Sequence, residues 1–285
     1  MAVYVSGCLC YRARAAASSR RARLAGVTTS TPDALWASRS VRLLHPTAVR
    51  CEGLRRAERG EPLLDGVDLS VPVGARLLLV SRPEASASLL LRILAGIARA
   101  DAGRLFLAGL ARADAGPVDW ARRVGYVGPR ASIHSWLSPR EALSLAGGLA
   151  ELRGPMLTQL VEASLERHGL LDVADRPMRR GGPAVAERVA LAAALLTDPE
   201  VLLLDEPLRA IDQEERLRLI GELPPRKTVI LASRYPSSEA GLVNHVVLLR
   251  QGRVAVHAPL AELGRRGLGL SMSGIESLAV LPRAG

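Results

Sequence analysis

The sequence predicts an α/β protein with a mainly parallel sheet, helices on both faces, an antiparallel β portion and an inserted helical block. Continuous aliphatic runs at residues 77–80 and 201–204 are typical of strands that are covered on both faces of a parallel sheet. Strand patterns and helix patterns alternate along the chain, which favours the same kind of sheet. Residues 138–176 interrupt this alternation with leucines at amphipathic helical spacing, and they predict a helical insertion.

The predicted elements follow one another in a regular order from residue 48 onward. Residues 67–71 alternate apolar and polar side chains, which predicts a half-buried strand. Residues 89–94 carry leucine and isoleucine at helical spacing directly after a short loop, an arrangement that suits phosphate binding at a helix N-terminus. Further strands are expected at 77–80, 104–108, 124–127, 201–204 and 228–232, further helices at 188–196 and 213–220, and a hairpin at 246–256.

Length and charge limit the class of protein. The 285 residues fit one α/β domain plus tails. The formal net charge is +10, but the first fifty residues contain eight arginines and one acid, Asp33, so that this segment carries +7 and leaves +3 for the rest. Residues 1–46 are therefore expected to be a disordered Arg/Ala-rich extension or an over-long gene start, with a transit peptide as the alternative. Nucleic acid is not an expected partner of the remaining chain.

Cysteine content indicates the redox compartment of the protein, and hydropathy indicates whether the chain can span a membrane. Cys8, Cys10 and Cys51 have neither the number nor the spacing of a zinc site or a disulfide framework, which favours a reduced compartment. The longest apolar run, residues 189–196, is far shorter than the roughly 20 residues of a transmembrane helix. If the protein works at a membrane, another chain must supply the spanning part.

Two acidic residues directly follow the buried strand at 201–204. Ligands gather at the carboxyl edge of a parallel sheet, so Asp205 is a candidate ligand of Mg²⁺ and Glu206 a candidate base for a water beside a phosphate. The alternative is a polar turn after a core strand.

Several short motifs occur in one fixed order along the chain. They lie at residues 64–67, 91–96, 101–103, 122–127 and 198–207, followed by Asp212. In this order and spacing the chain resembles the ATP-binding cassette family, the nucleotide-binding subunits of ABC transporters, over residues 48–265. The resemblance implies a P-loop NTPase-like cassette domain at 47–265, with a helical subdomain at about 132–180 and a poorly specified C-terminal tail at 266–285.

The resemblance also implies ATP and Mg²⁺ as cofactors and a phosphate loop at residues 81–89. In the family this loop carries glycines and a lysine, which let the triphosphate approach the backbone amides and meet a cation. Here the glycine positions are Ser81, Glu84 and Ser86, the lysine position is Ala87, and Ser88 and Leu89 follow, with Ser88 at the position of the Mg²⁺-binding hydroxyl.

Two penalties are expected from these replacements. A side chain forced into the left-handed conformation costs about 1–2 kcal/mol. Glu84 would add a like charge beside the triphosphate, at a cost of about 4 kcal/mol for a 4 Å approach at an effective dielectric constant near 20. Arg82 is either a substitute cation or a solvated side chain.

Other positions of the site depart from the family as well. Pro129 stands where the family has a glutamine, and Arg234 stands at the switch histidine. The signature loop corresponds to residues 179–183 or 181–185, and both alignments lack its serine and glutamine. The acids Asp205, Glu206 and the D-loop Asp212 are intact.

We therefore expect an ABC transporter cassette subunit with weak or absent ATP hydrolysis that acts as a scaffold or regulator. Its expected partners are a membrane-spanning subunit and a second cassette, at the inner face of the plasma membrane. Trp136 and Leu137 are candidates for lining a docking groove beside the helical block at 132–176. The alternatives are an atypical but active ATPase that energises transport, and a soluble cassette protein that binds other macromolecules.

Overall fold

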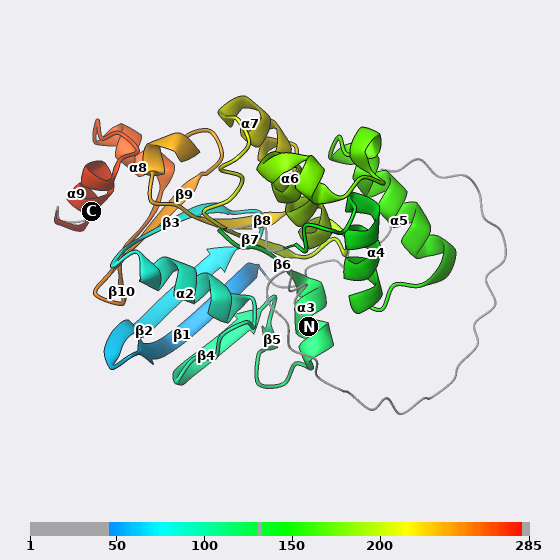
Figure 1. The fold of residues 1–285 in the computed structure, drawn as a ribbon. Helices are drawn as coiled ribbons and strands as arrows, with labels where there is room; N and C mark the ends of the chain where they lie inside the picture. The colour runs from blue at the N-terminus through cyan, green and yellow to red at the C-terminus, as the bar shows by residue number, and fades with distance from the viewer. Residues whose placement is uncertain (1–45, 130–132, 281–285) are drawn as a thin grey trace.

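The computed structural model describes residues 46–129 and 133–280, and it has the predicted α/β class. Its main sheet has the strand order β10-β9-β3-β8-β7-β6 (Figure 1), in which only β10 runs antiparallel to its neighbour. These strands are β3 (Arg76–Arg82), β6 (Val124–Val127), β7 (Val201–Asp205), β8 (Thr228–Ala232), β9 (His245–Arg250) and β10 (Arg253–Pro259).

A second, antiparallel sheet is the predicted β portion and has the order β2-β1-β4-β5. It comprises β1 (Thr47–Glu58), β2 (Glu61–Pro72), β4 (Ala102–Leu107) and β5 (Leu110–Ala111). Strand β1 was not predicted. Val49 and Cys51 alternate with Arg50 and Glu52, but this period-two pattern is short, because Gly53 and the register shift after Cys51 interrupt it.

The two faces of the main sheet contribute to separate hydrophobic cores. Leu77 and Leu79 of β3 pack with α2 (Ala85–Leu94) between the two sheets, while Leu78 and Val80 point to the opposite face. This alternation follows from the period of two in a strand and explains why both faces had to be aliphatic. Each buried leucine contributes about 1.5–3 kcal/mol relative to an exposed one.

The opposite face of the main sheet is covered by helices that come later in the chain. They are α6 (Gly182–Leu195), α7 (Gln213–Gly221), α8 (Leu260–Arg265) and α9 (Met272–Val280), with the short helix η3 (Pro236–Glu239) after β8. Helix α6 begins six residues earlier than predicted, because Pro183 at its first turn suits a helix start. Helix α3 (Pro117–Arg123) is anchored by its buried Trp120, whose indole N–H donates a hydrogen bond to the carbonyl oxygen of Leu94 at 3.0 Å.

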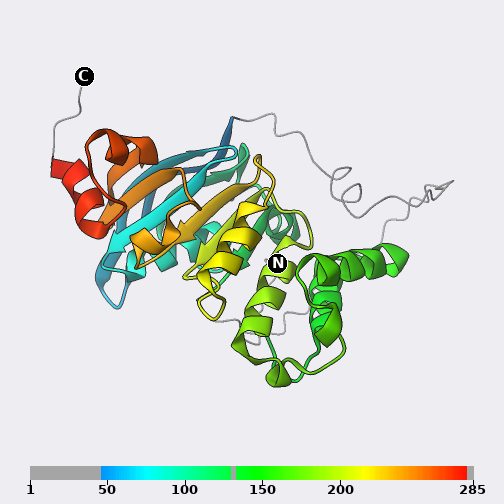
Figure 2. The ribbon, with the colours of Figure 1, turned by 90° about the horizontal axis from the view of Figure 1, so that it is seen from above.

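The inserted helical block has its own core. It contains α4 (Pro139–Leu149), α5 (Gly154–Arg167), η1 (Leu171–Val173) and η2 (Met178–Arg180), and it packs against α6. Ser138 and Glu141 form a capping box at the start of α4, which satisfies otherwise unpaired amides there. Figures 1 and 2 place this block at the end of the molecule opposite to α8 and α9.

The segment expected as a poorly specified tail contains an ordered helix. Within α9, Ile275 is fully buried in the core that also holds strands of the main sheet. The predicted extension lies, except for residue 46, outside the described residues, as do residues 281–285. Within the described ranges, no helix has both the length and the apolar character needed to cross a membrane.

Candidate functional site

A cavity of about 360 Å³ lies at the carboxyl edge of the main sheet, where β3, β7 and β8 end. Ligands gather at such edges because the strands stop there and helix N-termini point toward them. The lining residues are Val80, Ser81, Arg82, Glu84, Ala85, Ala87, Ser88, Pro129, Asp205, Glu206, Ala232, Ser233, Arg234 and Met272. The structure thus brings together most of the predicted site residues, namely Ser81, Ala87, Ser88, Asp205 and Glu206.

The predicted phosphate loop, residues 81–89, uses several of its polar groups internally. The hydroxyl of Ser81 accepts a hydrogen bond from the amide of Ala87 at 3.0 Å and donates one to the carbonyl oxygen of Glu84 at 3.0 Å. The amide of Ser86 donates to the carbonyl oxygen of Pro83 at 3.2 Å, and its buried hydroxyl donates to Leu63 at 2.8 Å. Two amides of the loop therefore already have protein partners.

The backbone of the loop avoids the strain that was expected at Ser81, Glu84 and Ser86, where the resemblance places glycines. Glu84 has φ −58° and ψ −33°, which is ordinary right-handed helical geometry. The residues with a positive φ do not include Ser81 or Ser86. The expectation of a left-handed penalty was wrong, because the loop takes a conformation that side-chained residues adopt easily.

Ser88 and Asp205, which were each candidate ligands of Mg²⁺, meet at the first turn of α2. The Ser88 hydroxyl donates to Asp205 Oδ1 at 2.8 Å, and the Tyr126 hydroxyl donates to Oδ2 at 3.2 Å. Burial raises the pKa of Asp205, and the two hydrogen bonds oppose this shift. Serine and aspartate oxygens suit Mg²⁺, which usually completes its shell with water and phosphate oxygens. The described residues contain no group of three or more His, Cys, Asp or Glu side chains that could hold a metal alone.

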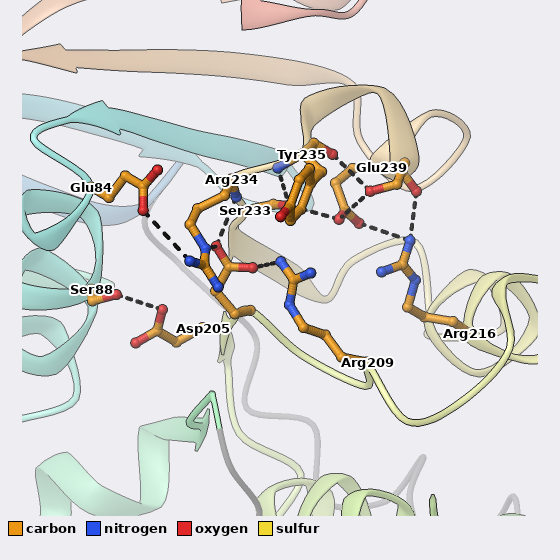
Figure 3. Close-up of polar contacts among 11 residues, drawn as sticks. Glu84, Ser88, Asp205, Arg209, Arg216, Ser233, Arg234, Tyr235 and Glu239 are labelled. Atoms are coloured by element: carbon orange, nitrogen blue, oxygen red, sulfur yellow. Dashed lines mark hydrogen bonds and ion pairs between the residues drawn. The ribbon is translucent and has the colours of Figure 1, made fainter.

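Glu206 lies between two arginines rather than free in the cavity. Its Oε1 accepts hydrogen bonds from the backbone amide of Arg234 at 2.7 Å and from the Arg234 guanidinium at 3.2 Å. Its Oε2 forms an ion pair with Arg209. Arg234 also lies 3.7 Å from a carboxylate oxygen of Glu84, so these charges form one chain across the cavity mouth (Figure 3). A base must contact the proton it removes, and here both carboxylate oxygens contact cations.

The one arginine of the phosphate loop, Arg82, has a partner in α9. Arg82 Nε lies 2.8 Å from Glu276 Oε1 of α9, although 62% of the Arg82 side chain remains exposed. Of the two roles considered for it, Arg82 is therefore the solvated side chain, with Glu276 as its ion-pair partner. The Glu84 side chain is 68% exposed, so the estimated repulsion of a phosphate by Glu84 is an upper limit.

Two predicted site residues, Asp212 and Leu89, and the two groove candidates, Trp136 and Leu137, lie elsewhere or act otherwise. Asp212 caps α7, where its carboxylate accepts a hydrogen bond from the amide of Glu215 at 2.9 Å, and it does not line the cavity. Leu89 is buried in the core between the sheets. Trp136 is exposed and stacks on His134 with ring centroids 4.3 Å apart, whereas Leu137 packs on the core of the helical block.

A buried polar network behind the cavity was not predicted. Ser233 donates to Glu239 Oε1 at 2.9 Å, and Arg216 lies 3.5 Å from the other oxygen of Glu239 and donates to Ser238 at 2.6 Å (Figure 3). This network fixes the loop that carries Arg234. The sequence offers no signal for it, because the partners come from α7 and η3 and share no spacing.

A larger cavity of about 760 Å³ separates the main sheet from the helical block. It lies at the amino ends of β6, β7 and β8, where Arg123 pairs with Glu200 at 2.9 Å and Lys227 pairs with Asp198 at 2.5 Å. Five acids and five bases line it, together with apolar residues: Leu110, Asp114, Ala115, Asp119, Arg122, Arg123, Ala150, Glu151, Leu152, Arg153, Met156, Thr197, Asp198, Pro199, Glu200, Arg226 and Lys227. Trp136 and Leu137 are not among them.

Comparisons with known sequences point to one family. A family model described as "ABC transporter" matches residues 64–209. The nickel import ATP-binding protein NikO of Rhodobacter capsulatus is 34% identical over 231 residues, which span 76% of this chain and 91% of that protein. The aliphatic sulfonates import ATP-binding protein SsuB 1 of Nocardia farcinica is 32% identical over 216 residues, which span 74% of this chain and 81% of that protein.

Solved structures have the same fold. An ATP-binding subunit of an ABC transporter superposes with a TM-score of 0.71 at 20% identity and covers 82% of this chain and 100% of its own. The cassette MJ0796, solved as a dimer bound to ADP and Pi, superposes with a TM-score of 0.66 at 19% identity and covers 74% of this chain and 98% of its own.

Proposed function

The chain belongs to the ABC transporter family as an ATP-binding cassette subunit, and from this premise we propose that its own ATP hydrolysis is weak or absent. In this proposal the subunit serves as a scaffold or regulator of a membrane-spanning partner or of a competent second cassette. It would work at the inner face of the plasma membrane.

The observation that carries the proposal is the state of the phosphate loop. Residue 87 brings no cation, and its amide is already bonded to the Ser81 hydroxyl at 3.0 Å. A triphosphate would have to displace that hydroxyl, and it would then meet an alanine side chain instead of an ammonium group. Charge-assisted hydrogen bonds are about twice as strong as neutral ones, so the loss of the cation weakens the site more than the loss of one amide.

Part of the site still suits the cofactors. Ser88 and Asp205 would hold Mg²⁺ beside the phosphates, since their oxygens converge within hydrogen-bond distance. Mg²⁺, when bound, would neutralise charge on the phosphoryl group. The contacts of Glu206 also support the proposal, because a carboxylate that contacts Arg209 and Arg234 is poorly placed to orient a water.

The larger cavity supports the role as a docking subunit. Its charges are balanced, with Arg122, Arg153 and Arg226 set among the acids, and the half-exposed Met156 adds an apolar contact at its rim. Such a groove suits a short amphipathic segment of a membrane subunit, whose polar side chains would pair with the rim charges while its apolar side contacts the methionine.

The test is phosphate release by the purified full-length chain with saturating Mg-ATP, compared with the variant Glu206→Gln. We expect both proteins to release phosphate at the same background rate, because Glu206 does no chemistry. An equilibrium titration of the wild type should give a dissociation constant far above the micromolar range.

A second candidate function, an atypical active ATPase, is favoured by the intact contact between Ser88 and Asp205. It predicts the opposite results in both measurements. Micromolar binding of Mg-ATP together with a turnover that Glu206→Gln abolishes would overturn the main proposal and establish this alternative.

A further inference from the structure

Helix α9 reaches the same cavity as the phosphate loop. Met272 at its start lines the cavity, and Glu276, one turn later, pairs with Arg82 at 2.8 Å. Figure 1 shows α9 beside β9, β10 and the end of β3 from which the loop departs. The C-terminal segment is therefore part of the wall of the site rather than a separate appendage.

The position of α9 is fixed by its own packing. Ser271 caps the helix. Its hydroxyl accepts a hydrogen bond from the Gly274 amide at 3.1 Å, and its carbonyl oxygen accepts one from the Ile275 amide at 2.9 Å. A Cβ atom at Gly274 would lie 2.2 Å from the carbonyl oxygen of Gly269, so this close approach requires glycine. Ile275 is fully buried against the main sheet. These contacts fix the helix that carries Glu276.

Arg82 is the one cationic residue in the loop at 81–88. It lines the cavity, and an arginine can bind a phosphate through two parallel hydrogen bonds. In the structure its guanidinium is paired with Glu276 instead.

We infer that Glu276 is a positioning residue that keeps Arg82 away from the phosphate position, so that α9 lowers the affinity of the cavity for nucleotide. This inference rests on the proposed weak nucleotide site, in which Ala87 supplies no cation. Without the Glu276 charge, Arg82 is free to contact a triphosphate. Its guanidinium then partly takes the place of the lysine that Ala87 does not supply.

The experiment is a calorimetric titration of the full-length chain with Mg-ATP, for the wild type and Glu276→Gln. Because an exposed ion pair contributes little, we expect the variant to bind about threefold to fivefold more tightly. Glu276→Asp keeps the charge and should restore the wild-type affinity. Glu262→Gln is the matched control, since Glu262 of α8 pairs with Arg266, the residue after that helix, at 2.7 Å and does not line the cavity.

The double variant Arg82→Gln/Glu276→Gln separates this mechanism from a loosening of the helix. It should lose the whole gain, because no cation remains to be released. Equal affinity of Glu276→Gln and the wild type would overturn the inference, and so would a gain that persists in the double variant. Neither result touches the proposed function, which fails separately if the wild type itself binds Mg-ATP with micromolar affinity.

Discussion

Replacing Ser88 by alanine should destabilise the protein through the charge of Asp205. Asp205 is 1% exposed, and Ser88 supplies one of its two hydroxyl donors, at 2.8 Å, while Tyr126 supplies the other at 3.2 Å. A hydrogen bond to a charged group is worth about 1.5–3 kcal/mol. We expect Ser88→Ala to lower the free energy of unfolding at pH 7 by about that amount.

The pH dependence of this loss has a definite sign. Burial already raises the folded-state pKa of Asp205 above its unfolded value, and the loss of the Ser88 donor raises it further. Between the two folded-state pKa values the variant binds more protons than the wild type, so its relative stability falls as the pH rises. The loss should therefore be largest at neutral pH and shrink as the pH drops through the folded-state pKa.

The assay is urea unfolding over a series of pH values, with Ser86→Ala as the matched control. Ser86 lies two residues away, and its hydroxyl donates at 2.8 Å to the uncharged carbonyl oxygen of Leu63. Its removal should cost about 1 kcal/mol at every pH, because the partner does not titrate. A Ser88→Ala loss that does not change with pH, or that stays below the Ser86→Ala loss at pH 7, would refute the assignment of a charged Asp205 bonded to Ser88.

Three further outcomes are expected. Asp205→Asn should raise the free energy of unfolding at neutral pH, because the wild type holds a buried charge there. The gain should vanish in acid, where the wild-type carboxyl becomes neutral. A difference in the free energy of unfolding that stays constant across the pH series would contradict this. Ile275→Ala should cost about 2–5 kcal/mol in chemical denaturation, since the side chain is fully buried; an unchanged midpoint would mean that α9 is not docked. Glu239→Ala should lower the free energy of unfolding by about 3–5 kcal/mol, because it leaves Arg216 buried without its carboxylate partner. Glu222→Ala, at the exposed C-terminal end of α7, should lower it little.

Much of the fold was predictable because a strand that is buried on both faces requires a continuous run of aliphatic residues. The strands at 77–80 and 201–204 had to be aliphatic at every position, since alternate residues enter different cores. The meeting of Ser88 and Asp205 was predictable for a related reason. Ser88 lies in the first turn of a helix that follows a parallel strand, and Asp205 ends a parallel strand, and such positions converge at the carboxyl edge of the sheet.

The sequence by itself determined the family-like order of elements, the alanine at residue 87 and the position of the acidic pair. Only the tertiary structure decided that Glu206 lies between Arg209 and Arg234, and that α9 brings Glu276 to Arg82 from 194 residues further along the chain. The physical reason lies in the range of the forces involved. Apolar burial acts on every turn of a helix and every second residue of a strand, so it imposes a period on the sequence. An ion pair needs only two side chains at one place in space, and it imposes none.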